Sequence, residues 1–242
     1  DMSYCGIPKK IGNYLLRETI GRGSFSTVKL AFNISTNEQF ACKIIPKKRL
    51  FGNGMENQFE KEVRILKHLV HPGVAILYDL LKDSINYYLI LELCPTGTLF
   101  DFIVSKTKIA EDESKYIFKQ IVTTLGFIHS QNVIHRDIKL ENILIDEKYN
   151  TKFIDFGFSA YYDPDNLSKT NCNTPNYASP QCLSGLPYDG QKSDIWSLGI
   201  ILYTMLVGKL PWTSANLKNV LVEIQSANIF YPYSISEEAR DL

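Results

Sequence analysis

The pattern of apolar residues changes near residue 95, and this change constrains the fold more than any other feature. Between residues 14 and 45, β-branched and aromatic runs are interrupted by turn-forming residues, which predicts three antiparallel strands. Later, apolar residues such as Ile117 and Leu125 recur at helical spacing, and residues 194–207 are apolar on nearly every side, as in a buried helix. Strands followed by helices are typical of an α+β fold, here a small antiparallel sheet and then a mainly helical part.

The first half also contains one helix. An apolar stripe through Phe59, Val63 and Leu66 predicts it, and two further strands are expected after it. We therefore expect two domains, residues 1–93 and residues 94–242. An interface between two domains is a common place for a small ligand, so we expect a binding cleft at this boundary.

The composition is that of an ordinary globular chain. Hydrophobic residues make up 45% of the 242 residues, which is enough for a sizeable core. The 26 basic and 26 acidic side chains cancel, so no excess of positive charge would draw the chain to nucleic acid or to an acidic membrane. The longest apolar stretch, residues 198–207, is too short to span a bilayer, and the N-terminus shows no signal pattern. We expect neither a nucleic-acid partner nor a membrane partner.

The cysteines indicate a reducing compartment. There are five, an odd number without close pairing: Cys5, Cys42, Cys94, Cys172 and Cys182. This arrangement argues against a disulfide framework and against a zinc cluster. We expect reduced thiols and an intracellular, cytoplasmic location, with the nucleus also open.

A glycine-rich turn, GRGSFSTV, lies between two of the predicted strands. Gly21 and Gly23 would allow backbone N–H groups to approach phosphate oxygens without a Cβ in the way. A pair of glycines in a hairpin is more often simply a turn, and the third glycine position holds Ser26. A dinucleotide-binding loop would need a helix directly afterwards, yet Val28 continues a strand, so the Rossmann interpretation fails.

Lys43 and Glu62 are predicted to be partners. Strand alternation places Lys43 on the same face as the small Ala41, inside an otherwise apolar strand. Glu62 lies on the inward stripe of the predicted helix, one turn from Leu66, where an unpaired carboxylate would be costly. Taken alone, a structural ion pair or a solvated lysine explains either residue well.

Two polar clusters follow in the second half. Asp137, Lys139 and Asn142 lie in the stretch IHRDIKLEN, after a helix predicted over residues 111–130, and apolar anchors surround them. Asp155 begins an Asp-Phe-Gly triplet after a predicted strand, where a carboxylate suits a hard cation and the glycine allows the chain to reverse. Each motif alone is weak evidence, but the set in this order is hard to explain otherwise.

Together these motifs resemble the signature set of the eukaryotic protein kinase catalytic domain, and the resemblance covers nearly the whole chain. The finer pattern is similar to the calcium/calmodulin-dependent kinase group, particularly its AMP-activated-kinase-like branch. The motifs are the glycine-rich loop, Ala-x-Lys at 41–43, His-Arg-Asp-x-Lys-x-x-Asn at 135–142, Asp-Phe-Gly at 155–157 and Asp-x-Trp-Ser-x-Gly at 194–199. The resemblance implies the two-lobed kinase fold, with one main helix in the N-lobe and a C-lobe truncated at its C-terminal end.

The resemblance implies a serine/threonine kinase that uses ATP and Mg²⁺ and acts on protein or peptide substrates. Lys43, oriented by Glu62, would hold the α- and β-phosphates. Asp137 would accept the proton of the substrate hydroxyl. Lys139 would neutralise the transferring phosphoryl group, and its place two residues after the base is typical of serine/threonine kinases.

The remaining site residues also come from the resemblance. Asn142 and Asp155 would bind Mg²⁺. Adenine would lie between apolar side chains and bind the hinge, with Leu91 as the gatekeeper. The residues expected to contact the nucleotide are Gly21, Gly23, Ser24, Phe25, Val28, Ala41, Lys43, Leu91, Glu92, Cys94, Glu141 and Leu144.

The stretch from Asp155 to Pro180 is loop-like and is expected to be regulatory. Thr170 matches the position that is commonly phosphorylated in this branch, and Arg136 would pair with the phosphate. The resemblance therefore implies an upstream activating kinase.

Three departures from the family pattern stand out. Gln181 replaces the glutamate of the Ala-Pro-Glu motif, so it cannot make that residue's ion pair, and Asn173 replaces a glycine. The chain ends at Leu242, where related domains continue, so we expect a truncated segment or a shortened helical lobe. The main alternative is a pseudokinase that binds nucleotide or a partner without phosphoryl transfer; a small-molecule kinase is disfavoured because residues 174–177 resemble a peptide-docking loop.

Overall fold

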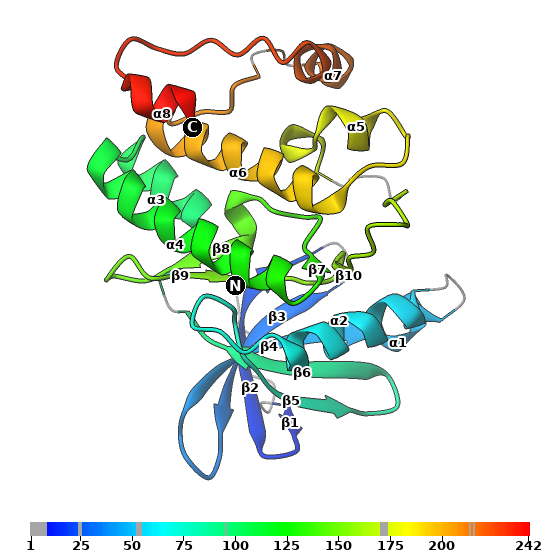
Figure 1. Cartoon of the computed structure of the whole chain (residues 1–242). Coiled ribbons are helices and arrows are strands. Elements are labelled where there is room, and N and C mark those ends of the chain that lie inside the picture. The colour runs from blue at the N-terminus through cyan, green and yellow to red at the C-terminus, as the bar shows by residue number, and fades with distance from the viewer. Residues whose placement is uncertain are drawn as a thin grey trace. The chain divides into compact units, whose positions relative to one another are not determined.

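The computed structural model describes residues 9–23, 26–51, 55–94, 96–169, 174–212, 214 and 216–242. The chain forms two compact units (Figure 1). The first comprises the described residues up to Val70 together with Ala75–Leu93, and the second comprises His71–Val74 and Cys94–Leu242.

The first unit is built on an antiparallel sheet. Its strands follow the order β1-β2-β3-β4-β6-β5, and each pairs antiparallel with its neighbours. Tyr14, Leu16, Cys42 and Ile90 form part of the core on one side of the sheet. The expected three strands followed by two more are confirmed, and the short β1 is an addition. The strands are β1 (Lys10–Ile11), β2 (Tyr14–Arg22), β3 (Thr27–Asn33), β4 (Gln39–Pro46), β5 (Leu77–Lys82) and β6 (Asn86–Glu92).

The predicted helix of the first unit is α2 (Glu56–His68), and a short α1 (Lys47–Leu50) precedes it. The apolar stripe of α2 is buried, as its helical spacing predicted. The helix ends at His68, and the next residue, Leu69, is its C-cap.

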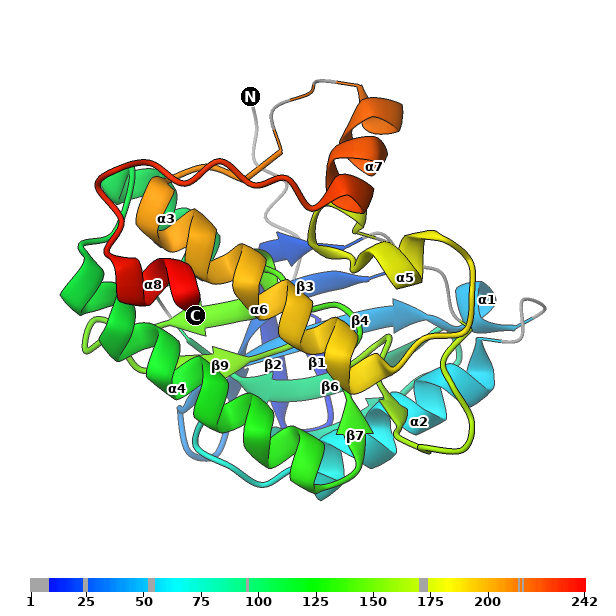
Figure 2. The same cartoon turned by 45° about the horizontal axis from the view of Figure 1, so that its top comes forward.

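The second unit is mainly helical. Helices α4 (Glu111–Ser130) and α6 (Gly190–Val207) pack against each other (Figures 1 and 2). The predicted apolar stripe of α4 is fully buried, and Asp189 caps the N-terminus of α6 by accepting two backbone N–H bonds. Ile195 of α6 is 56% exposed, so the expectation of burial on nearly every side fails at this residue. The other helices are α3 (Leu99–Lys106), α5 (Pro180–Leu183), α7 (Leu217–Ser226) and α8 (Glu237–Asp241).

Short elements between α4 and α6 hold the polar clusters. Strand β8 (Ile143–Ile145) pairs with β9 (Thr151–Phe153), and β7 (Val133–Ile134) pairs with β10 (Ala160–Tyr161). Two single 3₁₀ turns, η1 (Leu140–Asn142) and η2 (Pro175–Tyr177), complete this region. The polar stretch 135–142 is thereby anchored at both ends by paired strands.

Within the described residues, none of the helices combines the length and the apolar character that crossing a membrane requires.

Candidate active site

Lys43 and Glu62 form the ion pair expected from the sequence. Lys43 lies in β4 and its Nζ is 2.7 Å from Oε1 of Glu62 in α2. The side chains are only 13% and 7% exposed, so water screens their attraction weakly. Removing either partner would leave a poorly solvated charge, which is costly.

Most of the residues expected to contact the nucleotide from the first unit lie on adjacent strands. Val28 of β3 is opposite Lys43, and Ala41 is opposite Leu91 of β6. Gly21 of β2 is also opposite Val28. The sheet register therefore gathers these residues, and Glu92 ends β6 next to Leu91. Ser24 and Phe25 lie outside the described residues.

Gly23 closes the tip of the β2–β3 hairpin. Its N–H donates to the carbonyl of Ser26 at 2.9 Å. Gly23 and Ser26 therefore pair across the end of the β2–β3 hairpin.

Cys94 and Leu144 belong to the second unit. The thiol of Cys94 lies 3.6 Å from the carbonyl oxygen of Ile145, and Leu144 forms a β-bridge with Thr98. The segment after β6 is thereby bound to β8.

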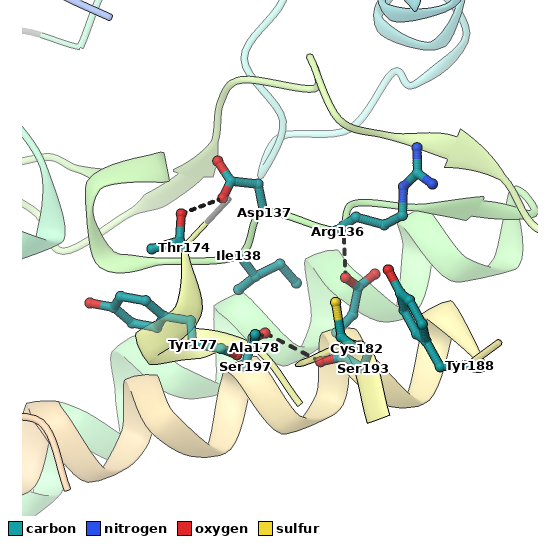
Figure 3. A pocket seen from close by; sticks show the side chains of 11 residues that line it. Arg136, Asp137, Ile138, Thr174, Tyr177, Ala178, Cys182, Tyr188, Ser193 and Ser197 are labelled. Carbon is teal, nitrogen blue, oxygen red and sulfur yellow. Dashed lines mark hydrogen bonds between the residues drawn. The ribbon is translucent and has the colours of Figure 1, made fainter. Parts of the chain in front are cut away.

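Asp137 is the centre of a buried hydrogen-bond network. Its side chain is 3% exposed. Oδ2 accepts bonds from Lys139 Nζ at 2.7 Å and from Asn142 Nδ2 at 2.9 Å. Oδ1 accepts one from the Thr174 hydroxyl at 2.9 Å, which Figure 3 shows. These donors fix the orientation of the carboxylate. Three predicted site residues thus meet, whereas the hydroxyl of Thr174 was not predicted to join them.

A second buried carboxylate, Asp194, holds the backbone beneath this network. It accepts bonds from the backbone N–H groups of His135 and Arg136 and from Nε2 of His129, each at 2.9 Å. Arg136 has a φ of 65°, a left-handed conformation that is strained for a non-glycine residue. Asp194 stabilises this conformation. In the sequence, Asp194 stood out only as the first residue of the Asp-x-Trp-Ser-x-Gly motif that resembles the kinase family.

Asn142 and Asp155 are suited to a magnesium ion. Both hydrogen-bonding contacts of the Asn142 amide nitrogen go to Asp137, so its Oδ1 is the atom suited to a cation. The N–H of Ile154 donates to the Asn142 carbonyl at 2.9 Å, which brings the next residue, Asp155, close to Asn142. Asp155 has a φ of 60°, which points to a constrained site.

Clusters of three or more His, Cys, Asp or Glu side chains that could hold a metal are absent among the residues described. Mg²⁺ prefers oxygen ligands, keeps several waters and binds substrate phosphates, so an amide oxygen and a carboxylate such as those of Asn142 and Asp155 suffice from the protein. The residues present therefore fit the ion.

Arg136 lines a pocket together with Tyr188 and Cys182 (Figure 3). Its Nε donates to the carbonyl of Phe158 at 2.6 Å, and burial lowers the pKa of its guanidinium. Thr170, its expected partner after phosphorylation, lies outside the described residues.

Glu141 is exposed in η1. The pKa of the Tyr177 hydroxyl is raised, chiefly by burial and further by the negative charge of Glu141.

Of the family departures, Gln181 is an exposed residue of α5, and Asn173 lies outside the described residues. The short α5 is capped by Ser179, whose hydroxyl accepts from the N–H of Cys182.

The fold and the polar network define the chain as a protein kinase domain. Residues 14–242 match the family model of the protein kinase domain, and the chain belongs to this family. The predicted two-lobed α+β kinase fold is thereby confirmed.

Curated relatives place the chain more closely. The SNF1-related protein kinase catalytic subunit alpha KIN12 of Arabidopsis thaliana is 39% identical over 95% of this chain and 46% of its own length. The serine/threonine protein kinase OSK3 of Oryza sativa is 39% identical over 98% of this chain and 47% of its own. The SNF1-like protein kinase ssp2 of Schizosaccharomyces pombe is 38% identical over 97% and 40%. The chain spans less than half the length of these relatives, and the predicted resemblance to the AMP-activated-kinase-like branch is confirmed.

Proposed function

We propose that the chain transfers the γ-phosphoryl group of Mg-ATP to serine and threonine hydroxyls of proteins. The observation that carries this proposal is the buried network around Asp137, because it holds an ionised carboxylate between a lysine and an amide in a member of the protein kinase family. The names of its relatives as serine/threonine protein kinases support the acceptor class.

In this proposal the two parts of the chain have different functions. Residues 1–93 bind the nucleotide, through the glycine-rich turn and the sheet face that carries Lys43. Residues 94–242 supply the catalytic loop and bind the protein substrate. Lys43, Asp137, Asn142 and Asp155 then act around one triphosphate.

Each polar side chain has one task. Asp137 accepts the proton of the attacking hydroxyl and orients that oxygen toward the γ-phosphorus. Lys139 offsets the charge of the transferring group, and Lys43, held by Glu62, fixes the α- and β-phosphates. Asn142 and Asp155 would hold Mg²⁺, whose charge when bound offsets that of the phosphates.

Regulation through Thr170 is the second part of the proposal. A phosphate on Thr170, added by an upstream kinase, would pair with Arg136, whose backbone adjoins Asp137. The half-buried guanidinium makes this pairing strong, because water screens it little.

Phosphate transfer from labelled ATP to a generic protein substrate tests the proposal. The chain is compared with Asp137→Asn, which removes the base, and with Asp112→Asn, a matched change at an exposed residue of α4. Transfer that is lost only in Asp137→Asn supports the proposal. Nucleotide binding without transfer in the unchanged chain would instead favour the pseudokinase.

A further inference from the structure

Besides the burial of its apolar stripe, two specific side-chain contacts between helix α2 and the sheet of the first unit bear on the orientation of the helix. One is the ion pair of Glu62 with Lys43. The other is an aromatic contact, in which the rings of Phe59 and Tyr87 lie 4.6 Å apart between centroids and are inclined by 36°. Phe59 precedes Glu62 by three residues, so the two side chains lie on the same face of α2.

Both attachment points lie on one face of the sheet. In the β4–β6 pairing Lys43 is opposite Leu89, and Ile45 is opposite Tyr87. Because side chains alternate along a strand, Lys43 and Tyr87 point to the same face, about 7 Å apart along the strand direction. Phe59 and Glu62 are about 4.5 Å apart along the helix axis, so one face of α2 contacts the sheet at both residues.

Tyr87 is itself fixed by its neighbours. The Nζ atom of Lys47 lies 5.1 Å from the centre of the Tyr87 ring and donates to the carbonyl of Asp83. The side chain of Asp83 accepts the N–H groups of Ile85 and Asn86 and so rigidifies the β5–β6 turn. The Tyr87 ring that contacts Phe59 is therefore held in place by Lys47 and by the hydrogen-bonded β5–β6 turn.

We propose that Tyr87 is a positioning residue for phosphoryl transfer, which holds α2 in the orientation where Glu62 reaches Lys43. This inference rests on the proposed function. Without the ring of Tyr87, the buried apolar stripe and the ion pair still hold α2, but the contact that fixes its rotation at Phe59 is lost, and a rotation of the helix separates Glu62 from Lys43. Tyr87 contacts α2 through the ring of Phe59, so its effect on activity passes through the helix.

The first test compares three variants by activity. Tyr87→Leu lowers kcat/KM about three- to ten-fold, the factor that corresponds to the loss of one aromatic pair. Tyr87→Phe keeps the ring and retains activity. Tyr78→Leu is the matched control, because Tyr78 of β5 also makes a ring contact in this sheet, with Phe40 at 5.0 Å, but not with α2. An equal loss in Tyr78→Leu would overturn the proposal, and Phe59→Leu replaces Tyr87→Leu if the latter fails to fold.

The second test distinguishes positioning from general stability. In a Glu62→Gln background, Tyr87→Leu causes little further loss, because both changes act on the same ion pair. Amide hydrogen exchange in α2 is faster in Tyr87→Leu and unchanged in Tyr78→Leu. The same fold-loss in both backgrounds, or unchanged exchange in α2, overturns the inference. The exchange result decides the role of Tyr87 even if the unchanged chain transfers no phosphate, which would refute the proposed function alone.

Discussion

The hydroxyl of Thr174 donates a 2.9 Å hydrogen bond to Oδ1 of Asp137, although the two residues are 37 positions apart in the chain. The same hydroxyl lies 3.3 Å from Nζ of Lys139. It therefore couples the C-terminal part of the stretch 155–180 to the carboxylate proposed as the base, and the orientation of Asp137 depends on this hydroxyl as well as on Lys139.

Replacing Thr174 by valine should lower kcat by about ten- to a hundred-fold, because a hydrogen bond to a charged group is lost without a change of shape. Thr174→Ser keeps the hydroxyl and should retain most of the activity. Steady-state kinetics of the two variants check this prediction, and equal activities would contradict it.

Asp194→Ala should lower the free energy of unfolding by about 3 kcal/mol, because it leaves buried backbone N–H groups without an acceptor. Urea denaturation measures the change. Asp112→Ala, at an exposed position of α4, should change stability by less than about 0.5 kcal/mol. A similarly small change in Asp194→Ala would show that the strained loop does not depend on this carboxylate.

Asp83 should make stability fall in acid. The hydrogen bond from Lys9, followed by those from Tyr88 and the backbone, lowers the pKa of Asp83 below its ordinary value. A carboxyl with a lowered folded-state pKa contributes stability above its unfolded pKa of about 3.9, and this contribution is lost as the pH falls toward the folded pKa.

Unfolding titrations between about pH 6 and about pH 3 check this sign. Asp83→Asn should show a smaller loss of stability over this range than the unchanged chain, and Glu60→Gln, at an exposed residue of α2, should behave like the unchanged chain. Identical pH profiles for Asp83→Asn and the unchanged chain would refute the assignment.

Gly208 should tolerate no side chain. It ends α6 with a φ of 83°, and an added Cβ would lie 2.0 Å from the carbonyl oxygen of Thr107. Gly208→Ala should therefore destabilise the chain by at least about 2 kcal/mol. Gly126→Ala, inside α4, would meet no described atom within 4 Å and should stabilise by up to about 1 kcal/mol. Thermal denaturation of the two variants shows whether each substitution lowers or raises the stability.

Periodicity predicted the long elements well, because their stability depends on a repeated apolar stripe. The helix expected over residues 111–130 is α4, and its stripe through Ile117 and Ile121 is buried. Short elements carry no such signal. Strands β1, β7 and β10 have two residues each, so their pairing depends on tertiary neighbours.

Sequence motifs predicted the individual residues of the site, but they did not predict the hydrogen bonds that join these residues to other segments. Lys43 and Glu62 could be paired because an inward charge needs a partner. The link from Thr174 to Asp137 and the three bonds to Asp194 join distant segments, and nothing in local spacing indicates them. The contact of Phe59 with Tyr87 could not be predicted either, because in the sequence both residues are ordinary apolar positions of a helix and a strand.

The central claim is that Lys43, Asp137, Asn142 and Asp155 act around a single Mg-ATP. A crystal structure of the chain with Mg²⁺ and a non-hydrolysable ATP analogue tests this claim most directly. Oxygen atoms of Asn142 and Asp155 should lie about 2.1 Å from the ion, with Lys43 on the phosphates and Asp137 facing the γ-phosphate. A nucleotide bound elsewhere, or these four side chains in separate places, would contradict it.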